Sequence, residues 1–184
     1  MALKRLNSDL VYRFWLASPY AFADWENPTA DEMNANPNND PDGLIFNITC
    51  ALNTDGTTFD IGTGDEDDSL TFCQRAGTTT VLNYTPEIVF QIERSTKRWL
   101  ESDPATMDDA NLAFSLLAWR GVEYFAIMSI GERPEAPVEP GDRLKLARVA
   151  TDYGLDEHAL GENVRMNAEL LSRGDIAWNV EVAA

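Results

Sequence analysis

The side chains best suited to chemistry in this sequence are clustered acids and amides. In DIGTGDEDD, residues 60–68, five of nine residues are acidic, and carboxylate oxygens are ligands that Ca²⁺ accepts. NNDPDG, residues 38–43, fits positions one, three, five and six of an EF-hand loop, but Thr49 stands where the motif needs a glutamate. Clusters of this composition are also common in plain turns. Both stretches fall short of a calcium motif, and we expect no metal site.

The groups that catalysis needs are sparse. His158 is the single histidine, and no serine lies in the strained G-x-S-x-G turn that places a hydrolase nucleophile. Zinc would need a second histidine or more cysteines. The two cysteines, Cys50 and Cys73, lie in apolar, strand-like runs, where we expect buried thiols, with a disulfide as the alternative. Since the sequence also has no glycine-rich phosphate loop, we expect no enzymatic activity and no cofactor.

Charge is the most unusual property of the composition. The 184 residues suit one domain, residues 1–184, and the 44% of apolar residues can fill a core. The 31 acids and 14 bases give a net charge of −17, which opposes binding to nucleic acid through phosphate neutralisation. The same charge also favours solubility, which is the simpler interpretation. Without an apolar run of ~20 residues or a secretory signal, we expect a soluble protein made in the cytoplasm.

Alternation of apolar and polar residues dominates the predicted secondary structure. A period of two with one apolar face is typical of antiparallel strands that cover a core on one side. Residues 122–130 are apolar on both faces and predict a central strand, and Ser172–Asp175 is a predicted hairpin turn. The alternating runs are 44–52, 87–93, 164–170 and 176–182, and shorter strands are predicted at 57–61, 69–74, 78–83 and 143–151.

The alternation also predicts which residues share a face. In the first run the apolar face comprises Leu44, Phe46, Ile48, Cys50 and Leu52, and in the last it comprises Ile176, Trp178, Val180 and Val182. One amphipathic helix is predicted after a capping sequence at Thr106, ending before Gly121. A shorter helix is predicted after Thr29.

Two segments fit neither strand nor helix. Residues 19–43 form an arm with aromatic side chains among prolines and asparagines, and residues 131–142 form a proline-rich loop. Long insertions in a compact domain usually have a function, so we expect both to contact a partner. The alternative for the arm is that it folds back over its own sheet.

The order of these features resembles a known family. An arm leads to PTADEM, then to the strand GLIFNITCAL, the helix MDDANLAFSLLAW, the strand VEYFAIMSIG, a proline-rich loop into PGDRLKLARVATDYG, and a closing hairpin from Ala159 to Ala183. From about residue 25 to the C-terminus, this succession resembles the major tail tube proteins of bacteriophages with long, non-contractile tails, particularly those of actinobacterial hosts.

The resemblance implies a fold and a structural role. Its members are mainly β (α+β) proteins, with an antiparallel β-sandwich or barrel, one flanking α-helix and long loop or arm insertions. They form homo-hexameric rings that stack into a tube around a tape-measure protein, between tail terminator and tip proteins. The tube later conducts double-stranded DNA without binding it specifically. The protein is then expected in the virion tail after assembly in the host cytoplasm, with no membrane partner.

An acidic channel wall is the physical expectation for such a tube. Carboxylates repel phosphate within a Debye length of ~8 Å at physiological salt, whereas a basic wall would retain DNA. The polar strand faces supply the candidates for the lumen, and external solvent is the alternative environment for them. These candidates are Glu87, Gln91, Glu93, Asn167, Glu169, Asn179 and Glu181.

Contacts between subunits or rings are predicted in the arm, the proline-rich loop and the acidic stretch. Residues 60–68 are expected to be an ordered strand-to-strand loop on an assembly surface, facing the lumen or an adjacent ring, with a solvated outer loop as the alternative. The interface candidates are Tyr20, Phe22, Trp25, Asp65, Glu66, Asp67, Asp68, Arg133, Pro134 and Pro137.

Two other classes compete with this hypothesis. A monomeric β-sandwich that binds carbohydrate would present a row of exposed aromatic side chains on one sheet face, and the five tryptophans of this sequence do not follow such a row. A related head-tail or tail joining protein with the same fold is the second alternative.

Overall fold

The structure of the protein is a computed structural model. It describes residues 12–35, 43–52, 57, 65–66, 79–81, 87–91, 109–130, 136–152, 155–157 and 165–184. Its main element is a seven-stranded antiparallel sheet in the order β2-β1-β6-β7-β9-β5, with β8 also paired to β9. The strands of this sheet are β1 (Tyr12–Ala17), β2 (Ile45–Asn47), β5 (Glu87–Gln91), β6 (Glu123–Ile130), β7 (Arg143–Thr151), β8 (Leu155–Glu157) and β9 (Arg165–Glu181).

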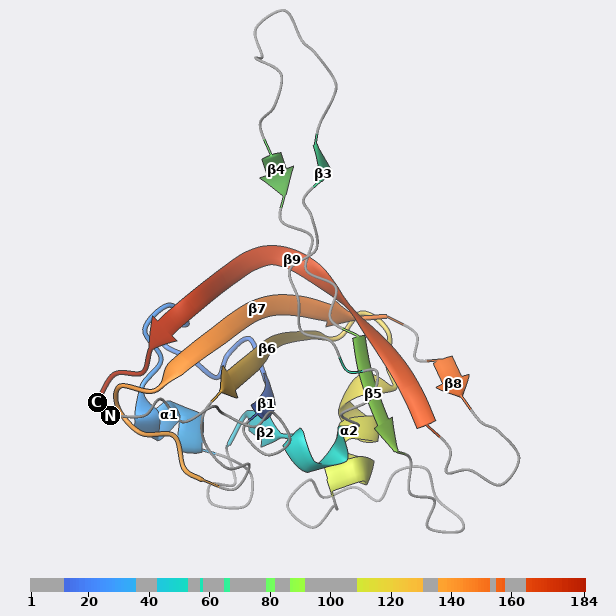
Figure 1. The fold of residues 1–184 in the computed structure, drawn as a ribbon, viewed down its shortest axis with the longest axis horizontal. Helices are drawn as coiled ribbons and strands as arrows, with labels where there is room; N and C mark the ends of the chain where they lie inside the picture. The colour runs from blue at the N-terminus through green and yellow to red at the C-terminus, as the bar shows by residue number, and fades with distance from the viewer. Residues whose placement is uncertain are drawn as a thin grey trace, which may run out of the picture.

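Short helices and a second hairpin complete the fold. The helices are α1 (Ala30–Asn34), the 3-10 helix η2 (Thr49–Ala51) and α2 (Asp109–Leu117). A separate two-stranded sheet pairs β3 (Asp65–Glu66) with β4 (Thr79–Val81) and stands away from the main sheet, beyond β9 (Figure 1). The prediction of a mainly β, antiparallel fold with a flanking helix is confirmed. No helix within the described ranges is long and apolar enough to cross a membrane.

Strand β6 lies in the middle of the sheet and is buried on both faces, as its double apolar pattern predicts. Tyr124, Ala126 and Met128 pack into one core with α2 and η2. Phe125 and Ile127 point to the opposite face and pack into a second core with α1 and the arm. The sheet is therefore covered on both sides, and the two cores share β6 and β7 as their common wall.

The first predicted strand is much shorter than its alternation suggests. Only Ile45–Asn47 is extended, and η2 follows directly. The Asn47 side-chain oxygen accepts bonds from the Thr49 backbone N–H at 3.0 Å and from its hydroxyl at 2.6 Å, a local turn that competes with the strand. Ile45 and Ile48 are consequently buried, while Leu44 and Cys50 are exposed, so the buried thiol predicted at Cys50 is wrong. Cys73 lies outside the described residues.

The predicted hairpin turn at Ser172–Asp175 is also wrong. β9 runs through it as one strand of 17 residues, and β7 pairs with both halves. Ser172 faces Val149 and Ile176 faces Ala147, so β9 has two residues more than β7 across this interval. Gly174 takes up the extra length at φ 92°, a backbone conformation that glycine adopts readily. The glycine that suggested a turn therefore makes a bulge in a bent strand (Figure 1).

A second bulge changes which side of the sheet the end of β9 faces. Lys145 is in register with Trp178 but Leu144 with Val180, which leaves Asn179 as an extra residue at φ 63°. Trp178 consequently packs toward the α2 core, while Val180 and Val182 pack toward the arm core. The prediction that these residues share one apolar face is wrong, because alternation holds only while the register is unbroken.

Other predicted elements agree with the structure. β7 has the predicted bounds, β4 and β5 lie inside predicted strands, and α2 buries Leu112, Ala113 and Leu117. Thr29 caps α1, with a complete capping box to Glu32. The cap predicted at Thr106 lies outside the described residues, as do the strands predicted at 57–61 and 69–74, apart from Thr57, which is not in a strand.

Candidate assembly surfaces

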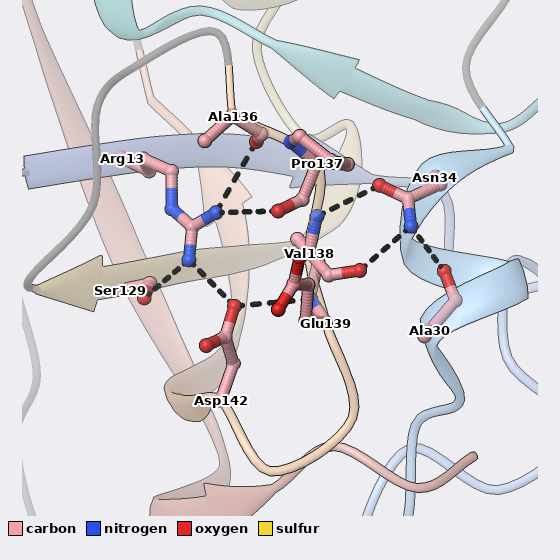
Figure 2. A network of polar contacts seen from close by, with 9 residues as sticks. All are labelled: Arg13, Ala30, Asn34, Ser129, Ala136, Pro137, Val138, Glu139 and Asp142. Carbon is pink, nitrogen blue, oxygen red and sulfur yellow. Dashed lines mark hydrogen bonds and ion pairs between the residues drawn. The ribbon is translucent and has the colours of Figure 1, made fainter.

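A buried arginine fixes the base of the proline-rich loop. Arg13 on β1 is fully buried, and its guanidinium donates to the carbonyl oxygens of Ala136 and Pro137, each at 3.2 Å (Figure 2). The other terminal nitrogen donates to Ser129 Oγ at 3.1 Å and forms an ion pair with Asp142 Oδ2 at 2.9 Å. A buried charge is tolerated only when it is paired and hydrogen-bonded, and these four acceptors satisfy both terminal nitrogens, while the buried Nε–H has no hydrogen-bond partner among the described residues.

A second clamp holds the same loop against the arm. Asn34, at the end of α1, donates to the carbonyl of Val138 at 2.8 Å, and its side-chain oxygen accepts the Val138 N–H at 2.9 Å (Figure 2). Val138 is buried in the arm core. Pro137, Glu139 and Pro140 remain exposed on this anchored base. Of the predicted contact residues in the loop, Arg133 and Pro134 lie outside the described residues.

The C-terminus fastens the loop to the arm. Val182 donates its N–H to the Asp142 carbonyl, and the Gly141 N–H donates to the Val182 carbonyl, both at 2.9 Å. Ala183 is hydrogen-bonded to the arm. Its carbonyl accepts from the Ala30 N–H, and its N–H donates to the Pro28 carbonyl. Arm, loop and C-terminus therefore form one connected end of the molecule.

The arm folds over its own sheet, which was the alternative to a free arm. Trp25 stacks on Phe125 with ring centroids 5.5 Å apart, and Phe22 meets the same ring edge-on at 5.9 Å. These two aromatic side chains pack inside their own chain, whereas Tyr20 is 87% exposed. A role for the three at a subunit boundary stays a prediction, and Tyr20 offers the most surface for it.

Glu32 ties the start of the arm to α1. Its carboxylate accepts the backbone N–H groups of Ala23 and Thr29, each at 2.9 Å, and the Thr29 hydroxyl at 3.0 Å. Partial burial alone would raise the pKa of Glu32, but these hydrogen bonds stabilise the carboxylate and lower its pKa overall. The arm is therefore held best when Glu32 is ionised.

A cluster of charges joins three strands at the other end of β6 and β7. Arg148 on β7 donates to Glu123 on β6 at 2.8 Å and to Asp175 in the β9 bulge at 3.3 Å. Arg173 approaches Glu123 at 3.6 Å. Hydrogen bonds to Glu123 and Asp175 raise the pKa of the Arg148 guanidinium. Sequence reasoning missed this cluster because its members are distant in the chain, and the bulge alone brings Asp175 to Arg148.

The lumen candidates do not share one face. Glu169 is exposed and Asn167 is half-buried, and both alternate with the core residues Met166, Ala168 and Leu170. Glu181 is in register with Arg143 and ion-paired to it, but it lies after the bulge at Asn179. Because register partners share a face, the bulges leave Glu181 on the side of the sheet opposite Glu169.

The structure describes the positions of the remaining lumen candidates in less detail. Asn179 is exposed within its bulge. In β5, the backbone of Glu87 is in register with Glu169, and that of Gln91 with Arg165. Glu93 lies outside the described residues.

The acidic stretch is partly a strand rather than a loop. Asp65 and Glu66 form β3, which pairs with β4 through Val81 and Thr79. Backbone pairing therefore takes precedence over the turn-like composition here. Asp67, Asp68 and His158 lie outside the described residues. Thr49 occupies the glutamate position of the EF-hand pattern. Its hydroxyl donates to the Phe14 carbonyl and to the side-chain oxygen of Asn47.

The main sheet has open edges in the part of the chain that the structure describes. Residues 170–181 of β9 pair with β7 on one side, and β5 reaches only to Glu169 on the other. At the opposite end of the strand order, β2 pairs with β1 alone. Unpaired strand edges of this kind can pair with another chain.

Comparison with known proteins gives a family match over the sequence and a similarity to a solved structure. Residues 1–184 match the family described as phage tail tube protein. No curated protein sequence matches the chain. Among solved structures, the SPP1 tail tube, a hybrid structure from solid-state NMR and cryo EM, aligns at 12% identity over 94% of this chain and 78% of that chain, with a TM-score of 0.49.

Proposed function

Because the chain belongs to the phage tail tube protein family and is a structural component of the virion tail, we propose that it closes into hexameric rings that stack into the tube. The observation that carries this proposal is that, among the described residues, two edges of the main sheet have no partner strand, β2 at one end and residues 170–181 of β9 at the other. Edge-to-edge pairing between copies satisfies both rows of backbone groups and leaves no edge in a closed ring.

The lumen of this tube is acidic. Six copies at −17 carry −102 per ring, and a carboxylate wall lets double-stranded DNA pass without binding. We assign the wall to the face of Asn167 and Glu169, near Glu87 and Gln91 in register, since Glu169 is exposed there. Glu181 lies across the sheet and belongs to a different surface.

The other partners follow from the family. The ring stack encloses a tape-measure protein and ends at tail terminator and tip proteins, with assembly in the host cytoplasm. The role is structural and uses no catalytic group. The binding-module alternative is less suitable, because the exposed aromatic side chains in the described segments, Tyr12, Tyr20 and Trp119, lie on separate elements and form no row.

Electron microscopy of the purified protein at increasing concentration tests the tube. We expect rings and then tubes, and a persistent monomer, even with the tape-measure protein present, contradicts the proposal. Glu169→Lys tests the lumen: particles should assemble but eject DNA more slowly. The matched control is Glu181→Lys, which should leave ejection kinetics at the native rate, and equal effects of both variants contradict the assignment of the wall.

A further inference from the structure

An aromatic hollow of about 460 Å³ lies where the arm crosses the start of β6. Tyr20, Phe22, Trp25 and Phe125 line it, together with Pro19. The charge cluster of Glu123, Arg148 and Asp175 completes its rim. Aromatic surfaces flanked by a few polar groups are the sites that proline-containing segments bind in an extended conformation.

An exposed proline segment lies at the other end of the same two strands. β6 runs from the hollow at Glu123 to the loop, and the chain returns along β7 from Arg143 to Arg148. On the loop side, Pro137, Glu139 and Pro140 are exposed, while Arg13 and Asn34 hold the backbone between them in place. Proline restricts its own backbone, so this segment loses little conformational freedom on binding.

The two features of one chain cannot meet each other. The hollow reaches Phe125 on β6, and the loop is anchored opposite Ser129, about 13 Å farther along the strand at roughly 3.3 Å per residue. The segment is also anchored at its own end by the Arg13 and Asn34 contacts. An occupant from this sequence must therefore come from a second copy.

We propose that the aromatic hollow of one copy takes the Pro137–Pro140 segment of the next copy, head to tail along the direction of β6 and β7. This inference rests on the proposed self-assembly and names a contact that joins successive copies. Prolines pack on Tyr20, Trp25 and Phe22, and the exposed Glu139 carboxylate approaches Arg148 on the rim, where it competes with Glu123 and Asp175 for the guanidinium. A heterologous contact of this kind need not close on itself, so it can repeat along a growing tube.

Cysteine cross-linking tests the contact in the full-length chain. In a background with Cys50→Ser and Cys73→Ser, the chain carries Tyr20→Cys and Glu139→Cys, both at exposed positions. Mild oxidation during assembly should give a ladder of linked dimers, trimers and longer chains. A mixture of the two single variants should give dimers only, and each single variant alone should give no ladder.

The matched control replaces Tyr20→Cys by Trp119→Cys, which is also exposed but lies at the end of α2 on the other core. We expect no ladder from Trp119→Cys with Glu139→Cys. Tubes that form without a Tyr20–Glu139 ladder, or with an equal ladder in the control, overturn this contact and leave the tube proposal intact. Absence of rings and tubes from the background chain itself overturns the tube proposal, and this contact with it.

Discussion

The two ends of the β6–β7 pair use arginine in opposite ways. At the loop end, Arg13 is fully buried and its guanidinium has four acceptors on three segments. At the hollow end, Arg148 is 38% exposed between two carboxylates that are themselves partly exposed. Breaking a buried ion pair lowers the free energy of unfolding strongly, because it leaves an unpaired charge in the interior. An exposed ion pair is screened by solvent and contributes little to stability. The loop end is therefore built for fixed geometry, and the hollow end remains adaptable.

The largest effect should come from breaking the loop end. Arg13→Met removes the donor for Asp142 and for two loop carbonyls, and we expect unfolding to become easier by about 3 kcal/mol, the lower end for a buried pair because Asp142 is 24% exposed. Urea denaturation followed by circular dichroism measures it. Arg148→Met serves as the control and should lose far less, so equal losses contradict the contrast between the two ends.

The next effect tests the clamp on the loop backbone. Asn34→Ala leaves the Val138 N–H and carbonyl without their side-chain partners, and we expect a loss of about 1–3 kcal/mol in the free energy of unfolding. Asn34→Asp places a carboxylate oxygen against the Ala30 and Val138 carbonyls to which the amide donated, so it should lose at least as much as Asn34→Ala. An unchanged denaturation midpoint in Asn34→Ala would rule out the clamp.

A smaller effect is expected at the hollow end. Glu123→Gln removes the shorter of the two carboxylate contacts of Arg148, and we expect a small loss of stability that shrinks further at high salt. Denaturation at low and at 1 M salt measures the difference. A loss of several kcal/mol, independent of salt, would show that this cluster behaves like the buried pair.

The smallest expected effect is a pH dependence at the arm that lines the hollow. The folded chain lowers the pKa of Glu32 below its ordinary value of 4.5, so ionised Glu32 favours the folded state. That contribution is present above pH 4.5 and disappears as pH falls through the lowered pKa. Glu32→Gln should therefore make the free energy of unfolding depend less on pH in this acid range, as measured by urea denaturation at a series of pH values. Glu26→Gln, at an exposed arm position, is the matched control and should behave as the native chain does.

Local chemistry made several parts of the fold predictable. The double apolar pattern of residues 122–130 predicts a central strand, because both faces of β6 must be covered. Thr29 predicts the start of α1, because a capping residue acts within a few residues of the chain, and the structure adds Glu32 as its capping-box partner. β7 also has the predicted bounds, Arg143–Thr151.

Interruptions of the pattern were not predictable in the same way. The sequence SRGD is compatible with a turn and with a bulge, and the continuous partner strand β7 decides for the bulge. Asn179 gives no local signal that it is an extra residue, yet it moves Val180 to the other core. The alternation that placed Glu181 on the same polar face as Glu169 breaks down at this point, because alternation assumes a constant register.

An acidic, mainly β chain with one central strand, one flanking helix and two inserted segments could be predicted from the order of the residues, because charge and apolar periodicity act within a few residues. The three-dimensional fold was needed to show that the arm covers its own sheet, that Arg13 anchors the loop, and that Glu169 and Glu181 lie on opposite faces. Each of these depends on contacts between residues far apart in the chain, and on a register that the partner strand sets.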